Sequence, residues 1–215
     1  MKAVIFDMDG VIFDSERLSK EVWLEIAGER GVEGFSDVYD KIIGVSKAGG
    51  KQIVCEAYGS EFPFDEIHAE AAMRKLTKFS NGHYPLKDGI EDLLIFLKEH
   101  GYKIGLASST EESVVRMHLE NSGLNVYFDC IICGNMVIHS KPNPEIFLVA
   151  CDKLGVLPEE SYIIEDSYNG IRAAARAGAF SIMVPDLKEP TEEMKSLANL
   201  IVKDLYEVKK YIEKR

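Results

Sequence analysis

Short apolar runs alternate with segments of helical periodicity from residue 88 to the end of the chain, and this alternation limits the possible folds more than any other feature. Helices are predicted between the apolar runs, which are typical of strands and cover residues 102–107, 128–133, 162–164 and 180–184. Strands that alternate with helices form a parallel sheet with right-handed crossovers. We therefore predict an α/β fold with a doubly wound parallel sheet.

One long segment interrupts this alternation. A strand predicted over residues 2–6 is followed, between residues 15 and 82, by helical patterns without a convincing strand. A helical insertion after the first strand would fold over the carboxyl edge of the sheet, where open α/β sheets bind their ligands. We predict a Rossmann-like core of residues 1–14 and 83–215, and an inserted α-helical cap domain of residues 15–82.

Composition excludes several classes of partner. The net charge of −11 at pH 7 disfavours binding to nucleic acid or to an anionic membrane surface. No apolar run approaches the roughly 20 residues that cross a bilayer, and the N-terminus lacks a signal-peptide pattern. We expect a cytoplasmic protein that acts on a small metabolite, with no nucleic-acid and no membrane partner. The sequence leaves the oligomeric state open, although we favour a monomer.

Two pairs of acidic residues come at the carboxyl ends of predicted strands. Asp7 and Asp9 follow the first strand, and their spacing of two places both side chains on one side of the chain. Glu165 and Asp166 follow the strand at 162–164, so all four should meet in one crevice. Four neighbouring carboxylates repel one another or take up protons, and a cation relieves this repulsion. Oxygen ligands of this type suit Mg²⁺, which we predict as the cofactor.

Hydroxyl groups and one lysine follow the other two predicted strands. Ser108 and Ser109 precede a helix, and the free backbone N–H groups at a helix start are a natural site for phosphate. Lys141 lies between Ser140 and a proline, in a loop stiffened by two prolines, where its ammonium group could be aimed at a phosphate. We predict that these groups bind phosphate beside the metal.

Each of these motifs also has a purely structural interpretation. The segment Asp7-Met8-Asp9-Gly10 can be a polar turn after a strand. Ser109 with Glu112 fits a capping box for the helix that follows, and Asp166 can cap the helix predicted from about residue 169. Capping at a helix start and binding of phosphate at the same place are compatible.

The motifs together resemble the four ordered motifs of the haloacid-dehalogenase-like hydrolase superfamily, in this chain Asp7-x-Asp9-Gly10, Ser108, Lys141 and Glu165-Asp166. Phe6 to Ser15 and Glu165 to Ser167 are similar to the β-phosphoglucomutase-like phosphatase branch, whose helical cap is inserted after the first strand. Any single motif is weak, but four in order across nearly the whole chain are specific.

The resemblance implies a Mg²⁺-dependent phosphatase that hydrolyses a small phosphomonoester, such as a sugar phosphate. Asp7 would attack phosphorus to form an aspartyl-phosphate, and Asp9 would protonate the leaving oxygen and then deprotonate the incoming water. A carboxylate with an ordinary pKa near 4 is ionised at pH 7, so Asp7 would need no base. The metal would be held by Asp7, the backbone carbonyl of Asp9 and Asp166, with Glu165 binding directly or through water.

Substrate choice should depend on the cap. Gly44-Val45-Ser46-Lys47 resembles the cap segment that reaches into the site in this branch, so Lys47 either meets a distal group of the substrate or is simply solvated. A β-phosphoglucomutase, which returns the phosphoryl group to the sugar, is the nearest alternative. Those mutases carry a histidine where this chain has Ser19 and an arginine where it has Lys47, so we favour the phosphatase.

An alternative outside the enzymes is a phospho-accepting receiver domain, which also combines acidic residues, a hydroxyl and a lysine on a parallel sheet. The order of the motifs argues against it, because the presumed acceptor Asp7 follows the first strand and a second aspartate comes two residues later. A receiver domain would also lack the helical insertion.

Overall fold

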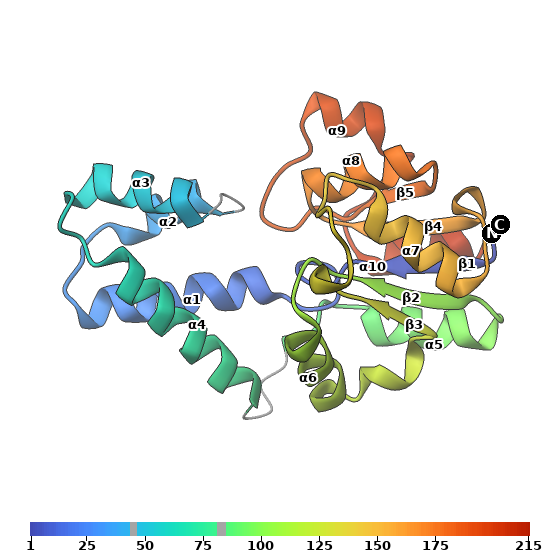
Figure 1. Ribbon diagram of the computed structural model, residues 1–215, viewed down its shortest axis with the longest axis horizontal. Helices are drawn as coiled ribbons and strands as arrows, with labels where there is room; N and C mark the ends of the chain where they lie inside the picture. The colour runs from blue at the N-terminus through green and yellow to red at the C-terminus, as the bar shows by residue number, and fades with distance from the viewer. Residues whose placement is uncertain (44–46, 81–84) are drawn as a thin grey trace. The chain divides into compact units, whose positions relative to one another are not determined.

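The computed structural model describes residues 1–43, 47–80 and 85–215, and these residues form two compact units (Figure 1). One unit combines Met1–Asp14 with Leu86–Arg215, and the other is the helical segment Ser15–Pro85. The predicted boundary between residues 82 and 83 lies outside the described residues. Within the described part of the chain, no helix is both long enough and apolar enough to cross a membrane.

A six-stranded parallel sheet forms the centre of the first unit, in the order β3-β2-β1-β4-β5-β6. The strands are β1 Ala3–Phe6, β2 Lys103–Ala107, β3 Cys130–Ile132, β4 Ser161–Glu165, β5 Phe180–Met183 and β6 Leu200–Ile201. The central strand β1 is completely buried, as its uninterrupted apolar run predicts. The doubly wound α/β fold is confirmed. The edge strand β6, with only two residues, is too short to produce a sequence pattern.

Helices cover both faces of the sheet (Figure 1). They are α5 Ile90–Glu99, α6 Glu112–Ser122, α7 Glu145–Leu154, α8 Tyr168–Ala177, α9 Glu192–Leu197 and α10 Leu205–Ile212. Single turns of 3₁₀ helix occur at Leu124–Tyr127, Gly134–Met136 and Pro158–Glu160. Ala3 and Ile5 of β1 pack in one cluster with the buried faces of α7 and α8, which fixes those two helices next to the central strands. Because α8 follows β4 after only two residues, it starts at the carboxyl edge of the sheet.

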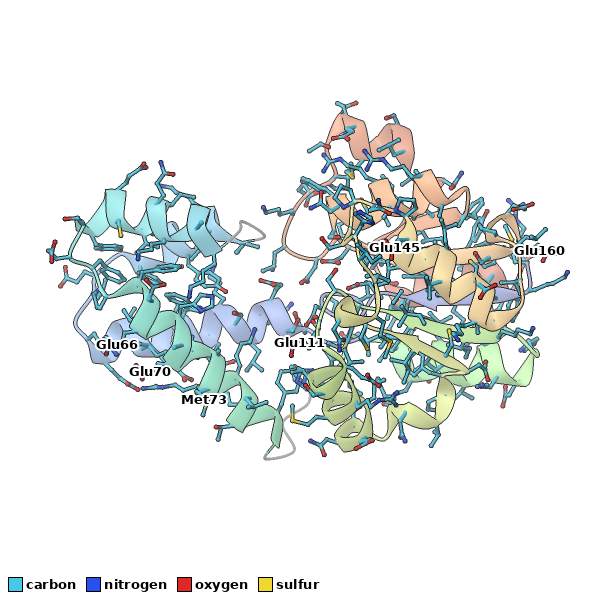
Figure 2. The ribbon with its side chains drawn as sticks, in the orientation of Figure 1. Glu66, Glu70, Met73, Glu111, Glu145 and Glu160 are labelled. Carbon is cyan, nitrogen blue, oxygen red and sulfur yellow. The ribbon has the colours of Figure 1, made fainter. Side chains whose placement is uncertain are left out.

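The described residues of the second unit form four helices, α1 Ser15–Glu29, α2 Phe35–Ile42, α3 Lys47–Tyr58 and α4 Phe64–Ser80. Its core is aromatic: the Trp23 ring stacks on Phe35 with centroids 5.7 Å apart, and Phe64 packs against the same indole at 5.6 Å. On its surface Arg30 donates hydrogen bonds to Glu66 and Glu70 of α4 (Figure 2). The predicted absence of strands from this segment holds for its described residues.

Candidate active site

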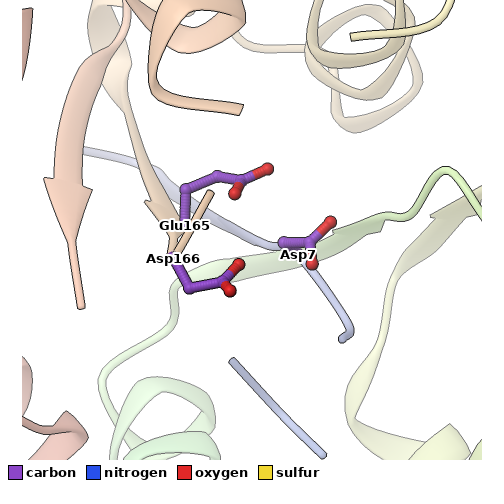
Figure 3. Close-up of side chains that lie close together, drawn as sticks. All are labelled: Asp7, Glu165 and Asp166. Atoms are coloured by element: carbon purple, nitrogen blue, oxygen red, sulfur yellow. The ribbon is translucent and has the colours of Figure 1, made fainter. Parts of the chain in front are cut away.

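Three carboxylates meet where β1 and β4 end side by side. Phe6 pairs with Ile164, and the backbone N–H of Asp7 continues the ladder by donating to the Ile164 carbonyl at 3.0 Å. Asp7 is therefore next to Glu165, the last residue of β4, and Asp166 follows directly. One oxygen from each of the three carboxyl groups lies within 4.8 Å of the others (Figure 3). The structure thus brings together three of the four predicted acidic residues through their side chains.

Lys141 places its ammonium group among these acids. Its Nζ lies 2.5 Å from Asp7 Oδ1 and 2.7 Å from Glu165 Oε1, and it donates a third hydrogen bond to the Ala107 carbonyl at 2.9 Å. Only 6% of the lysine side chain is exposed, so the charges interact with little screening by water. All three donor positions of the ammonium are used, and the lysine is held in one direction.

The loop that carries Lys141 is fixed by its neighbours. The Glu145 carboxylate at the start of α7 accepts hydrogen bonds from the backbone N–H groups of Ile138 and His139 at 2.8 and 3.0 Å (Figure 2). Arg176 of α8 donates to the Pro142 carbonyl at 2.8 Å. Pro144 is the N-cap of α7, which begins at Glu145 just after this loop.

Both oxygens of Glu165 are occupied by protein groups. Oε1 accepts from Lys141, and Oε2 accepts from the backbone N–H and the hydroxyl of Ser167 at 3.1 and 2.9 Å. A Cβ atom on Gly170 would lie 1.8 Å from the Glu165 carboxyl carbon, so only glycine leaves room for this side chain. Ser167, and not Asp166, caps α8, by accepting from the Gly170 N–H at 3.0 Å. The alternative interpretation of Asp166 as the cap of this helix is therefore wrong.

Gly10 makes equivalent room for Asp166. A Cβ at this position would lie 2.3 Å from Asp166 Oδ2, and the φ of +81° is in the left-handed region that favours glycine. The turn after β1 is closed by the Gly10 N–H, which donates to the Phe13 carbonyl at 2.8 Å. Asp7-x-Asp9-Gly10 is therefore a tight turn that also leaves space for the Asp166 carboxylate, which directly follows the adjacent strand β4.

Burial and mutual repulsion change the pKa values at this cluster. Burial, opposed by Lys141 and reinforced by the charges of Glu165 and Asp9, raises the pKa of Asp7 to about 7. Burial, followed by the charges of Glu165 and Asp7, also raises the pKa of Asp166. Burial alone would lower the pKa of Lys141, but its two carboxylate partners raise it. The ordinary pKa near 4 expected for Asp7 is therefore wrong, because that value applies to a solvated carboxyl group.

The hydroxyl groups after β2 divide between the two sides of the loop. Ser108 is buried, and its Oγ accepts a hydrogen bond from the Thr110 N–H at 3.1 Å, whereas Ser109 is exposed. Thr110 donates its own hydroxyl to Asp9 Oδ2 at 3.0 Å, a contact that no sequence pattern indicated. Asp9 thus interacts with the loop after β2, and its side chain is not part of the three-carboxylate cluster.

The predicted capping box of α6 is wrong. The N-cap is Glu111, without a side-chain hydrogen bond, and the N–H of Glu112 is satisfied by the Asn135 side chain at 3.1 Å. A Cβ on Gly134 would lie 2.2 Å from the backbone oxygen of Ser109, so the 3₁₀ turn after β3 presses closely on the loop after β2. Partners from distant sequence therefore shape this loop.

Lys47 is the one predicted site residue in the helical unit. It begins α3, is more than half exposed, and forms an ion pair with Asp65 of α4 at 3.2 Å. Asp65 also accepts a hydrogen bond from Lys51 at 2.6 Å. The preceding predicted segment Gly44–Ser46 lies outside the described residues.

The sheet carries Asp7, the candidate nucleophile, beside a buried lysine and a Glu-Asp pair, and a helical unit is inserted after its first strand. Comparison of the whole sequence with known protein families agrees with this arrangement. A sequence model of the haloacid dehalogenase-like hydrolases matches residues 1–178. The chain belongs to this family. The resemblance that the motifs suggested is confirmed.

Relatives of this haloacid dehalogenase-like hydrolase include both phosphatases and mutases. This chain is 35% identical over 180 residues to a phosphorylated carbohydrates phosphatase of Thermotoga maritima, and the match covers 83% of this chain and 82% of that protein. It is 31% identical over 194 residues to a β-phosphoglucomutase of Bacillus subtilis, covering 86% and 83%. A solved β-phosphoglucomutase from Clostridium difficile superposes with a TM-score of 0.71 at 28% identity, over 100% of this chain and 96% of that one.

Proposed function

We propose that this chain is a Mg²⁺-dependent phosphatase that hydrolyses a small phosphomonoester, such as a sugar phosphate, through an aspartyl-phosphate on Asp7. The observation that supports the proposal most strongly is the buried cluster of Asp7, Lys141, Glu165 and Asp166 at the carboxyl edge of the sheet. This cluster contains Asp7 as the nucleophile, Lys141 as a group that binds phosphate, and the two further acids Glu165 and Asp166. We further propose that the unit Ser15–Pro85 acts as the cap that selects the substrate.

The acidic cluster fits a divalent cation. Three carboxylates meet within 4.8 Å, and Lys141 supplies only one compensating charge to them. Oxygen donors of this kind are the ligands that Mg²⁺ prefers. Asp7 and Asp166, with the backbone carbonyl of Asp9, would hold the ion, which would lower the pKa of Asp7 and neutralise phosphate oxygens. Because both Glu165 oxygens are engaged by Lys141 and Ser167, Glu165 would influence the ion through water and through these partners.

The chemistry uses two displacements at phosphorus. In the first, an Asp7 oxygen forms a bond to phosphorus while the bond to the leaving oxygen breaks, and Asp9 gives its proton to that oxygen. In the second, a water oxygen attacks phosphorus, Asp9 takes the proton of the water, and the bond to Asp7 breaks to release inorganic phosphate. Lys141 and Ser108 stabilise the charge on the transferring oxygens. Thr110 sets the direction of Asp9 through its hydrogen bond.

Transfer back to a sugar, as in a mutase, is the alternative reaction for the same site. Ser19 and Lys47 stand where the mutases resembled by this sequence carry histidine and arginine. Lys47 is paired with Asp65, and a lysine cannot form the two-pronged contact of an arginine. These differences favour water as the acceptor.

The test is a panel of phosphorylated sugars, polyols and nucleotides scored by released phosphate, with wild type and Asp7→Asn. The substitution keeps the shape of the side chain but removes the nucleophile, so we expect a loss of at least about 10⁴-fold. Circular dichroism and the thermal midpoint check that the variant folds, and EDTA should abolish the activity of the wild type.

Two outcomes would contradict the proposal. Activity of Asp7→Asn within tenfold of wild type would exclude Asp7 as the nucleophile. Conversion of β-glucose 1-phosphate, supplied with its 1,6-bisphosphate, to glucose 6-phosphate faster than phosphate is released would identify a mutase instead.

A further inference from the structure

Asp186 lies at the same edge of the sheet as the acidic cluster, one strand further out. The backbone pairing of β5 with β4 extends beyond both strands, because the Val184 N–H donates to the Glu165 carbonyl at 2.8 Å. Asp186 follows two residues later. Asp166 directly follows Glu165, the last residue of the neighbouring strand β4. Both aspartates therefore lie just beyond the carboxyl ends of adjacent strands.

The two oxygens of Asp186 have different surroundings. Oδ1 accepts a hydrogen bond from Lys87 Nζ at 2.7 Å, and only 5% of the carboxylate side chain is exposed. Oδ2 is buried and has no hydrogen-bond partner among the residues that the structure describes. A buried carboxylate oxygen without a donor costs free energy, so native proteins almost always supply a partner, a water or an ion. Lys87 fixes one oxygen and leaves the other available.

The negative charge of Asp186 acts on Asp166, one of the proposed metal ligands. After burial and the charges of Glu165 and Asp7, it is a further cause that raises the pKa of Asp166. Asp186 is not one of the three carboxylates that converge within 4.8 Å, but it follows β5, which pairs with β4 at the same edge of the sheet. A carboxylate at this remove suits contact with a metal ion through water, because Mg²⁺ retains several waters when protein carboxylates bind it.

We propose that Asp186 is a positioning residue for the cation: its Oδ2 accepts a hydrogen bond from the hydration shell of the ion held by Asp7 and Asp166. This inference rests on the proposed function, because it requires the metal site. Carboxylates that hydrogen-bond to the waters or ligands of a metal ion tune the affinity of the site for that ion. Their loss typically weakens metal binding or activity 10- to 100-fold. Lys87 holds Oδ1 and thereby directs the carboxylate.

The test measures metal binding without substrate. Mn²⁺ is titrated into the full-length protein, and unbound Mn²⁺ is counted by electron paramagnetic resonance, for wild type, Asp186→Asn, Lys87→Gln and the double variant. Both single variants break the ion pair, but only Asp186→Asn removes the acceptor charge. We expect Asp186→Asn to bind Mn²⁺ about 10- to 100-fold more weakly. Lys87→Gln should bind at least as tightly as wild type, because the glutamine amide can still donate a hydrogen bond to Oδ1 while a positive charge is removed.

The double variant guards against misfolding, since it leaves no unpaired buried charge, and it should also bind weakly. Binding by Asp186→Asn and the double variant within twofold of wild type would overturn the inference. Equal weakening in Lys87→Gln would overturn it too, because the ion pair alone would then explain the effect. A wild type that binds Mn²⁺ but releases no phosphate from the panel would instead contradict the phosphatase proposal.

Discussion

The two units of the molecule use the same kinds of charged side chains for opposite purposes. In the sheet unit, Lys141 and Glu165 form a pair in which the lysine is 6% exposed and the glutamate is fully buried. In the helical unit, Arg74 bridges Glu29 and Glu70 with 31% of its side chain exposed. Exposed pairs contribute little to stability, whereas breaking a buried pair leaves an uncompensated charge. Burial therefore distinguishes the charges that we propose act in catalysis from the exposed charges that join helices.

The largest difference between the units should appear when one cation is removed from each. Lys141→Met leaves two buried carboxylates without their partner, so we expect destabilisation of about 3–5 kcal/mol and at least about 10²-fold lower phosphatase activity. Arg74→Met should leave activity unchanged and shift the thermal midpoint only slightly. Thermal unfolding and phosphate release measure both effects. Equal shifts of the midpoint would remove the contrast between the units.

A smaller but still clear effect is expected from adding one methyl group. In Gly170→Ala the new Cβ would lie 1.8 Å from the Glu165 carboxyl carbon, which must move and disturb Lys141. We expect destabilisation of about 1–3 kcal/mol and a loss of activity of about tenfold or more. Gly50→Ala in α3 is the matched control, because its nearest side-chain contact, with Phe64, is at an ordinary 3.6 Å. An active, stable Gly170→Ala enzyme would show that Glu165 needs no such fit.

The next largest difference between the two units should be in how their carboxylates respond to pH. The pKa of Asp7 is raised to about 7, so at limiting Mg²⁺ the nucleophile becomes protonated and activity falls as the pH drops through that value. Bound Mg²⁺ disfavours the protonated form, so each tenfold rise in Mg²⁺ should move the acid midpoint down by up to about one pH unit. Lysine partners lower the pKa of Asp65, so Asp65→Asn should not move this midpoint. A midpoint independent of Mg²⁺ would separate Asp7 from the metal.

The smallest effect should come from a helix position with no neighbour to disturb. A Cβ on Gly28 of α1 would meet nothing within 4 Å, and its φ is not in the left-handed region. Gly28→Ala should therefore raise the free energy of unfolding by up to about 1 kcal/mol through helix propensity, without changing activity. Chemical denaturation measures this gain, and a loss of stability would mean that α1 needs the flexibility of glycine.

The sequence could predict the sheet and most of the cluster because strand ends and apolar runs are local signals. Asp7 and Glu165 could be placed together once their strands were recognised, since parallel pairing aligns the carboxyl ends. The partners of these residues could not be predicted in the same way. Gly170 acts through a steric fit, and Asn135 satisfies a helix start 23 residues away. Neither the steric fit nor this hydrogen bond produces a periodic pattern in the sequence.

Helix starts show the same limit. A capping pattern was assigned to Ser109 and to Asp166, but Glu111 and Ser167 occupy those positions. Several polar residues in a row can each satisfy a capping pattern, and only the path of the chain decides between them. The pKa of Asp7 could not be predicted either, because it depends on burial, on the neighbouring Asp9 and on charges from two other segments, those of Lys141 and Glu165.

Ser167 has a consequence for the order of hydrogens around the site. Its oxygen accepts from the Gly170 N–H of α8, and its own hydrogen is donated to Glu165, whose other oxygen receives Lys141. The backbone N–H and the ammonium can only donate, so every link runs in a single direction. These hydrogen bonds therefore lead from both sides to Glu165, which lies beside the proposed nucleophile Asp7 and near the partial positive charge at the start of α8. They also give the cluster a fixed polarity before any ligand arrives.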